Sequence, residues 1–108
     1  GIENIEKLLA YDAVDGVMIG PYDLSGSLGV PGQPNHPRVL ESCQRVIDAC
    51  KKLGKSCGTQ IVDVHDAAID AALASGYTFV ILSSDLFVLW KWSEQTQISI
   101  KSLRSRSA

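Results

Sequence analysis

Short apolar runs alternate with helix-like segments along this sequence, and the alternation restricts the folds that the chain can adopt. The apolar runs have the length of buried strands, and between them apolar residues recur every three or four positions, as in amphipathic helices. In chain order the sequence predicts a helix at 2–11, a strand at about 15–19, a helix at 37–53, a strand at about 56–62, a helix at 64–75, a strand at about 77–82 and a last helix after Ser83–Asp85. Such an order is typical of an α/β fold, a parallel sheet covered by helices.

The number of predicted strands is too small for a closed barrel. A (β/α)₈ barrel takes about 250 residues, whereas this chain has 108 and begins at Gly1 within a helical pattern. We therefore expect residues 1–108 to be one partial domain, the C-terminal part of a TIM barrel with its last three βα units. The polar tail at 101–108 is expected to fray. A small three-stranded doubly wound domain is the alternative.

Composition and cysteine spacing exclude several classes of protein. The net charge of −2 gives no sign of nucleic-acid binding, and no apolar run is long enough to cross a membrane. The cysteines, Cys43, Cys50 and Cys57, are odd in number and do not form a disulfide framework. Cys43 and Cys50 lie about 10 Å apart along one helix, too far to share a zinc ion. We expect buried, reduced thiols in a cytoplasmic protein.

The most informative loop follows the first predicted strand, in the stretch DGVMIGPYDLSGSLGVPG at 15–32. Function in parallel α/β folds collects at the carboxyl ends of strands, and Asp23 lies just past such an end. A carboxylate there suits a hard cation such as Mg²⁺, and the small residues around it let backbone N–H groups approach an anion. From spacing alone, Asp23 equally fits the start of a turn or the cap of a short helix through Leu24–Ser25.

Other polar residues near predicted helix starts have simple structural explanations. Asn35 or His36 fits the cap of the helix at 37–53, and His65 lies in the first turn of the helix at 64–75, which Asp63 would cap. Neither histidine is predicted to be catalytic. The turn Ser83–Asp85 fits plain N-capping better than anion binding.

The stretch DGVMIGPYDLSGSLGVPGQPNHP closely resembles the G-V-x-I-G-P-x-D-L-S-x-S-x-G segment of the HpcH/HpaI-type aldolases. These enzymes include 2,4-dihydroxyhept-2-ene-1,7-dioate and 2-keto-3-deoxy-L-rhamnonate aldolases and belong to the phosphoenolpyruvate/pyruvate barrel superfamily, with citrate lyase β-like proteins as relatives. The similarity extends from about Gly1 to about Trp92, and GYTFVILSSD looks like the family's last strand.

The resemblance implies a class II aldolase that cleaves a 2-keto-3-deoxy acid to pyruvate and an aldehyde. In such enzymes a divalent metal, Mg²⁺, Mn²⁺ or Co²⁺, binds pyruvate and stabilises its enolate. Asp23 would be one of two carboxylate ligands, and the backbone around Tyr22 and Asp23 would help to hold the pyruvate carboxylate.

The resemblance also implies that much of the site lies upstream of Gly1. The family's second ligand, a glutamate, precedes the helix that begins at Gly1, and Glu3 and Glu6 on that helix are poor substitutes. The arginine and histidine of the site come from earlier strands. We therefore expect the isolated chain to be inactive. The alternatives are a citrate lyase β-like acyl-CoA lyase and a non-catalytic assembly module.

Two residues and one helix depart from ordinary barrel features. Gln60 stands where these aldolases often have an apolar residue in the aldehyde pocket, so it either alters aldehyde choice or is a polar residue satisfied by its neighbours. Tyr22 replaces a common alanine and could narrow the site. The last helix, LFVLWKWSEQTQISI, carries both tryptophans. Family members form homo-oligomers, commonly hexamers, and exchange C-terminal helices, which implies a partner-facing helix; packing on the barrel is the alternative.

Overall fold

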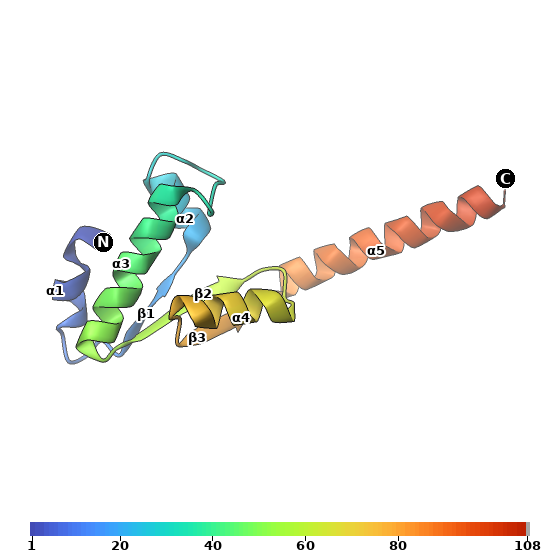
Figure 1. Cartoon of the computed structure of the whole chain (residues 1–108). Helices are drawn as coiled ribbons and strands as arrows, with labels where there is room; N and C mark the ends of the chain where they lie inside the picture. Colours follow the sequence, from blue (N-terminus) through green and yellow to red (C-terminus); the bar gives the residue numbers. More distant parts are fainter. Residues whose placement is uncertain (108) are drawn as a thin grey trace.

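A computed structural model describes residues 1–107 and has a three-stranded parallel sheet at its centre (Figure 1). The strands are β1 (Gly16–Ile19), β2 (Ser56–Ile61) and β3 (Phe79–Leu82), in the spatial order β1-β2-β3. Ile19 pairs with Thr59, and Gln60 pairs with Ile81. The predicted parallel strands are confirmed, each one or two residues shorter than expected.

Helices precede, separate and follow the strands. They are the 3₁₀ turn η1 (Ile2–Asn4), α1 (Ile5–Leu9), α2 (Pro21–Ser27), α3 (Pro37–Leu53), α4 (Asp66–Ser75) and α5 (Asp85–Arg106). Helix α3 has its predicted bounds, because Pro37 presets its first turn and Gly54 ends it with a left-handed φ of 64°. Helix α4 starts later than predicted, at Asp66, and His65 rather than Asp63 is its N-cap.

Helix α2 lies inside the stretch that the sequence predicted as one long loop at 20–36. Its first turn forms because Pro21 has a preset φ and the Leu24 N–H donates to the Gly20 carbonyl at 2.9 Å. Leu24 and Leu28 pack against the core. Asp23 is therefore the third residue of a short helix. The sequence alternative of a short helix at this place is correct, but Gly20 and not Asp23 is its N-cap.

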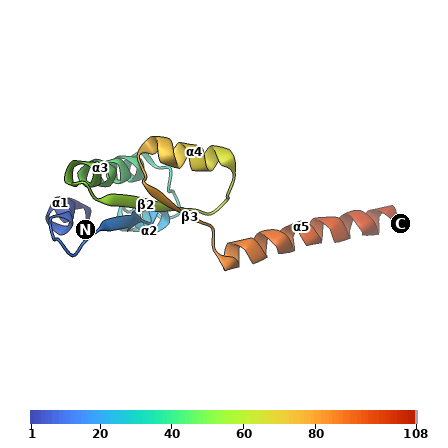
Figure 2. The ribbon, with the colours of Figure 1, turned by 90° about the horizontal axis from the view of Figure 1, so that it is seen from below.

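The core lies on one face of the sheet. Figure 2 shows α3 and α4 together on one side of the strands, and α1 packs beside α3. The buried apolar residues come mainly from α1, α3 and alternate strand positions: Ile5, Leu9, Ile19, Val39, Cys43, Val46, Ile47, Ala49, Cys50, Cys57 and Ile61. All three cysteines are buried free thiols, as expected.

The opposite face of the sheet is bare. Met18 of β1 precedes the buried Ile19, and Phe79 and Ile81 of β3 flank the half-buried Val80. The exposed fractions of Met18, Phe79 and Ile81 are 51%, 40% and 40%. The Phe79 ring lies against Gly58, where a Cβ atom would overlap it. Parallel strands are normally covered on both faces. A bare apolar face is therefore consistent with a sheet that forms part of a barrel wall.

Helix α5 extends away from the rest of the molecule (Figure 1). None of its 22 residues is buried, and the Cα radius of gyration is 18.2 Å, against about 13 Å for a compact domain of 100 residues. Within the segment 101–108, which the sequence predicts to fray, α5 continues as far as Arg106, where Arg104 and Arg106 suit the negative end of the helix dipole. Residue 108 lies outside the described residues, and fraying of this segment stays a prediction. Within the described residues, no helix has the length and hydropathy to cross a membrane.

Candidate functional site

The carboxyl ends of the three strands bring the candidate residues to one edge of the sheet. Gly20 and α2 follow β1, Gln60 lies near the end of β2, and Ser83 follows β3. Because Ile19 pairs with Thr59 in a parallel register, the next residues, Gly20 and Gln60, lie side by side. This edge is where parallel α/β folds place their binding sites.

Asp23 is exposed in the first turn of α2, and its carboxylate folds back toward the end of β1. A Cβ atom on Gly20 would lie 2.9 Å from Asp23 Oδ2, so glycine leaves the room that the carboxylate uses. Within the described residues, no hydrogen bond or ion pair engages the two carboxylate oxygens. They are therefore free to bind a hard cation, which usually takes one or two carboxylates together with water and substrate oxygens.

The described residues do not gather a metal centre around Asp23. No group of three histidine, cysteine, aspartate or glutamate side chains comes together among residues 1–107 in a way that could hold a metal ion. Glu6, on α1, is paired with Lys52 of α3 at 3.2 Å. The described residues therefore do not complete a coordination sphere by themselves.

Ser25 is the site residue that the sequence did not single out. It is fully buried, its Oγ donates to the Tyr22 carbonyl at 2.6 Å, and the Gly32 N–H donates to that Oγ at 3.2 Å. The Ser25 carbonyl also accepts from the Val30 N–H at 2.9 Å. Ser25 therefore ties the loop after α2 to the first turn that carries Asp23. The serine of the D-L-S motif, three residues after Tyr22, was the available signal.

The Tyr22 side chain lies on the helix-covered side of this edge. It is 62% exposed and lines a hollow of about 380 Å³ together with Pro34, Leu40 and Tyr77. Its backbone carbonyl and Asp23 belong to the same helical turn. The ring therefore forms a wall between α2 and α3, and the backbone is the part of Tyr22 that lies beside Asp23.

Gln60 is half-buried and bound to the turn after β3. Its Nε2 donates to the Ser83 carbonyl at 3.0 Å, and the Ser83 N–H donates to the Ile61 carbonyl at 2.8 Å. Ser83 has a φ of 61°, which is uncommon for a residue other than glycine. The Gln60 Nε2 group is thus satisfied by a neighbouring carbonyl, and a role of Gln60 in aldehyde choice stays a prediction.

The turn Ser83–Asp85 leads directly into α5. Ser84 is the N-cap by position, but its hydroxyl makes no capping hydrogen bond, so the side-chain capping that the sequence favoured is not present at Ser84. Asp85 Oδ1 instead accepts from the Leu86 N–H at 2.8 Å, and its negative charge occupies the position that an anion would take.

Both histidines cap helices, which the sequence predicted as one of two possibilities for His36 but not for His65, since it placed His65 in the first turn. His36 Nδ1 accepts from the Arg38 N–H, and His65 Nδ1 accepts from the Ala68 N–H, each at 3.2 Å. A ring nitrogen that accepts a backbone hydrogen bond is not available as a base. Asp63, predicted to cap α4, instead pairs with Lys91 of α5.

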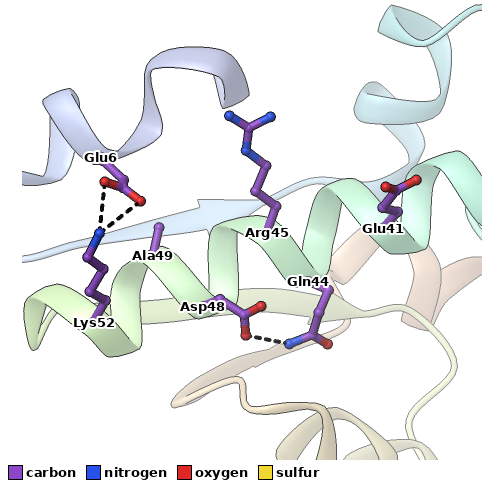
Figure 3. Close-up of a pocket in the computed structure, with 7 residues that line it drawn as sticks. All are labelled: Glu6, Glu41, Gln44, Arg45, Asp48, Ala49 and Lys52. Carbon is purple, nitrogen blue, oxygen red and sulfur yellow. Dashed lines mark hydrogen bonds and ion pairs between the residues drawn. The ribbon is translucent and has the colours of Figure 1, made fainter.

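A polar hollow between α1 and α3 lies on the outer surface of the helices and does not belong to this edge (Figure 3). Four of its polar side chains are paired with one another: Lys52 with Glu6, and Gln44 Nε2 with Asp48 Oδ1 at 2.9 Å. Because Asp23, Tyr22 and Gln60 do not line it, this hollow is not the candidate site.

Comparison with known proteins decides the family. The family model described as HpcH/HpaI aldolase/citrate lyase matches residues 1–91. The chain belongs to the HpcH/HpaI aldolase/citrate lyase family. It is 40% identical over 89 residues to the hydroxypyruvate/pyruvate aldolase of Roseobacter denitrificans, covering 82% of this chain and 34% of that protein. It is 36% identical over 110 residues to the 2-keto-3-deoxy-L-rhamnonate aldolase of Salmonella paratyphi A, covering 98% of this chain and 39% of that protein.

A solved structure from the same family has a similar fold. The crystal structure of an HpcH/HpaI aldolase from Desulfitobacterium hafniense superposes with a TM-score of 0.83 and 32% identity, over 93% of this chain and 38% of that one. The fold is therefore part of a TIM barrel, which confirms the prediction over the doubly wound alternative. The chain spans about a third to two fifths of the length of these relatives.

Proposed function

We propose that the chain is the C-terminal part of a barrel enzyme that cleaves a 2-keto-3-deoxy acid to pyruvate and an aldehyde. Residues 1–108 would form one partial domain of that enzyme. The observation that carries this proposal is Asp23, an exposed and unpaired carboxylate at the carboxyl end of β1, within the family's motif. The two relatives described above are aldolases by name, which favours this reaction over cleavage of an acyl-CoA.

A divalent cation, Mg²⁺, Mn²⁺ or Co²⁺, would supply Lewis-acid stabilisation of the negative charge that develops as the carbon–carbon bond breaks. Asp23 is the residue of this chain that would hold the cation, since its carboxylate is exposed and carboxylate oxygens are the ligands that hard cations prefer. The backbone around Tyr22 and Asp23 would orient the pyruvate carboxylate. Gln60, next to Gly20 on the same edge, would face the aldehyde half.

The metal role of Asp23 is tested in the full-length enzyme that contains this chain, by following the release of pyruvate with and without Mn²⁺. We expect Asp23→Ala to lower kcat about 100- to 1000-fold, the usual loss when one group that stabilises developing charge is removed. Calorimetric titration with Mn²⁺ should show weaker binding. Asp12→Ala, which removes an exposed carboxylate before β1, is the control. Full activity of Asp23→Ala would refute the assignment.

We also propose that the isolated chain is inactive, because its described residues gather no group of three metal ligands and its sheet has one bare face. The three buried thiols, free of disulfides, support a cytoplasmic location. Purified chain that releases pyruvate at a measurable rate would contradict the first of these proposals.

Helix α5 is proposed as a contact between copies in a homo-oligomer. Exposed residues recur along it at alternating spacings of three and four, the pattern of paired helices: Leu86, Leu89, Ser93, Thr96, Ile100 and Leu103. The four apolar members of this stripe are between 45% and 69% exposed. A second copy of the chain would remove that apolar surface from water.

A further inference from the structure

Helix α5 is attached to the rest of the molecule almost entirely through the carboxyl end of β2. Lys91 pairs with Asp63, which lies in the loop after β2. Phe87 and Trp90 line a groove of about 230 Å³ together with Val62. At the start of the helix, Gln60 of β2 donates to the Ser83 carbonyl. Hydrogen bonds, charge and apolar contact thus converge on residues 60–63.

These contacts use one side of the helix. Phe87, Trp90, Lys91 and Glu94, which line the groove, follow one another at spacings of three, one and three and so share one side of the helix. Leu89 and Ile100 of the apolar stripe are turned by more than a third of a rotation from that side, given about 100° per residue. Phe87 is half-buried, whereas Leu86 and Val88 on either side of it are 69% and 58% exposed.

We propose that the carboxyl end of β2, through Gln60 and Asp63, positions α5, setting both its direction and the side that carries the exposed stripe. Gln60 fixes the left-handed turn at Ser83 from which the helix leaves. Asp63 then fixes its rotation through Lys91, two turns into the helix. The depressed pKa of Asp63, caused first by its hydrogen bond with Lys91, agrees with that contact.

The positioning role ties α5 to the edge that carries the candidate site. Gln60 is flanked by Gly20 of the Asp23 loop on one side and by Ser83 on the other. The strand end that would face the aldehyde therefore also holds the helix that would meet a partner. This link rests on the proposed function, but the positioning of α5 does not, because it concerns contacts within one chain.

Substitutions that reverse the charges of Asp63 and Lys91 test the proposal in the 108-residue chain. The chain also carries Trp92→Phe, so that Trp90 is its sole tryptophan. We expect Asp63→Lys and Lys91→Asp each to speed amide exchange at residues 83–91 about two- to fivefold, the range for exposed ion pairs. Each should also shift Trp90 emission to longer wavelength. The double variant should restore both readouts. Lys101→Glu, at an exposed lysine further along α5, is the control.

Gln60→Met tests the second contact, the hydrogen bond from Gln60 to the Ser83 carbonyl. We expect amide hydrogen exchange to become two- to tenfold faster at Ser83 and in the first turn of α5. Amides of α3 should keep their protection in every variant, which separates local release from unfolding. The proposal is wrong if the single variants match Lys101→Glu, if the double variant restores nothing, or if α3 loses protection equally. None of these readouts depends on activity or association, so such a failure would leave the proposed aldolase reaction standing.

Discussion

At the residue scale, the geometry around Asp23 depends on a buried hydroxyl. Ser25 Oγ makes two hydrogen bonds, to the Tyr22 carbonyl and from the Gly32 N–H, that water cannot replace at a fully buried position. Without them, the loop after α2 would lose its attachment to the turn that carries Asp23. A buried donor left without a partner costs more than the hydrogen bond itself contributes.

Ser25→Ala should therefore lower the free energy of unfolding by about 1–3 kcal/mol, because both hydrogen bonds of the buried Ser25 hydroxyl would be lost. The measurement is urea denaturation followed by circular dichroism. Ser27→Ala is the matched control: its hydroxyl is exposed and bonds only the Asp23 carbonyl, at 3.2 Å. A Ser25→Ala chain as stable as Ser27→Ala would show that Ser25 does not hold the loop.

The buried thiol of Cys57 predicts how stability changes in alkali. Burial raises the pKa of Cys57 from 9.0 to about 12, and a nearby Cys50 adds to the shift. Because the folded pKa is the higher one, this contribution is complete below pH 9 and is lost as the pH rises from 9 to 12. The free energy of unfolding should fall over that range by at most about 1.4 kcal/mol per pH unit for this group.

Denaturation curves at several pH values check the expectation, with Cys57→Ala as the reference. That variant lacks the titrating thiol, so its free energy of unfolding should fall less steeply between pH 9 and 12. Some fall should remain, because Tyr77 keeps its raised pKa. Parallel slopes in the two proteins would mean that folding does not raise the pKa of Cys57, which would contradict the expectation.

At the element scale, sequence reasoning succeeded where single residues mark an element's ends. Pro37 and Gly54 fix both ends of α3, and the three apolar strands are too short and too continuous to be helices. Helix α2 was missed because four of its seven residues are proline, glycine or serine, which are typical of loops. It forms because Leu24 and Leu28 reach the core, a contact that local sequence does not reveal.

The candidate site was predictable in its position but not in its contacts. The motif placed Asp23 at a strand end, and the structure has it there. The partners of Gln60 and Ser25 were not predictable, because Ser83 is 23 residues from Gln60 and the burial of Ser25 depends on how the loop folds. Such contacts follow from the tertiary arrangement.

The pairing of β1 with β2 depends on a glycine. A Cβ atom on Gly16 would lie 2.7 Å from the Ser56 carbonyl oxygen, which is backbone and cannot rotate away. Gly16→Ala should therefore force the two strands apart and cost about 1–3 kcal/mol of stability, measured by thermal or urea denaturation.

Gly26→Ala is the matched control for Gly16→Ala. Gly26 lies in α2 with nothing within 4 Å of the added Cβ, so the same change there should be neutral or stabilise by up to about 1 kcal/mol. Equal effects at the two positions would show that the close approach of β1 and β2 does not limit Gly16.

At the scale of the whole molecule, the chain consists of a sheet covered on one face and a helix that extends away from it. Helices cover one face of the sheet, the other face is bare, and α5 extends from the edge of the sheet with no buried residue. Both features agree with a chain that spans about a third to two fifths of its relatives' length. They also leave two apolar surfaces for other polypeptide to cover.

If α5 joins copies of the chain, charge placed on its stripe should reduce self-association. We expect Leu89→Glu with Ile100→Glu to lower the association constant at least about 10-fold, because two buried charges would oppose pairing. Sedimentation velocity over a range of concentrations measures it. Gln95→Glu with Ser102→Glu adds the same charge away from the stripe, and it should associate as the unchanged chain does. Equal weakening by both pairs would refute the stripe as the contact.

The one-sided core has a thermodynamic consequence. The heat capacity of a protein rises on unfolding chiefly because apolar surface becomes hydrated, by about 12–15 cal/mol/K per residue in a compact domain. Here Met18, Phe79, Ile81 and the apolar residues of α5 already meet water in the folded state. Because these side chains are already partly hydrated, their hydration changes less on unfolding than that of buried side chains. The stability curve of the isolated chain is therefore flatter than that of a compact protein of equal length, with a weaker dependence on temperature at both its cold and its warm end.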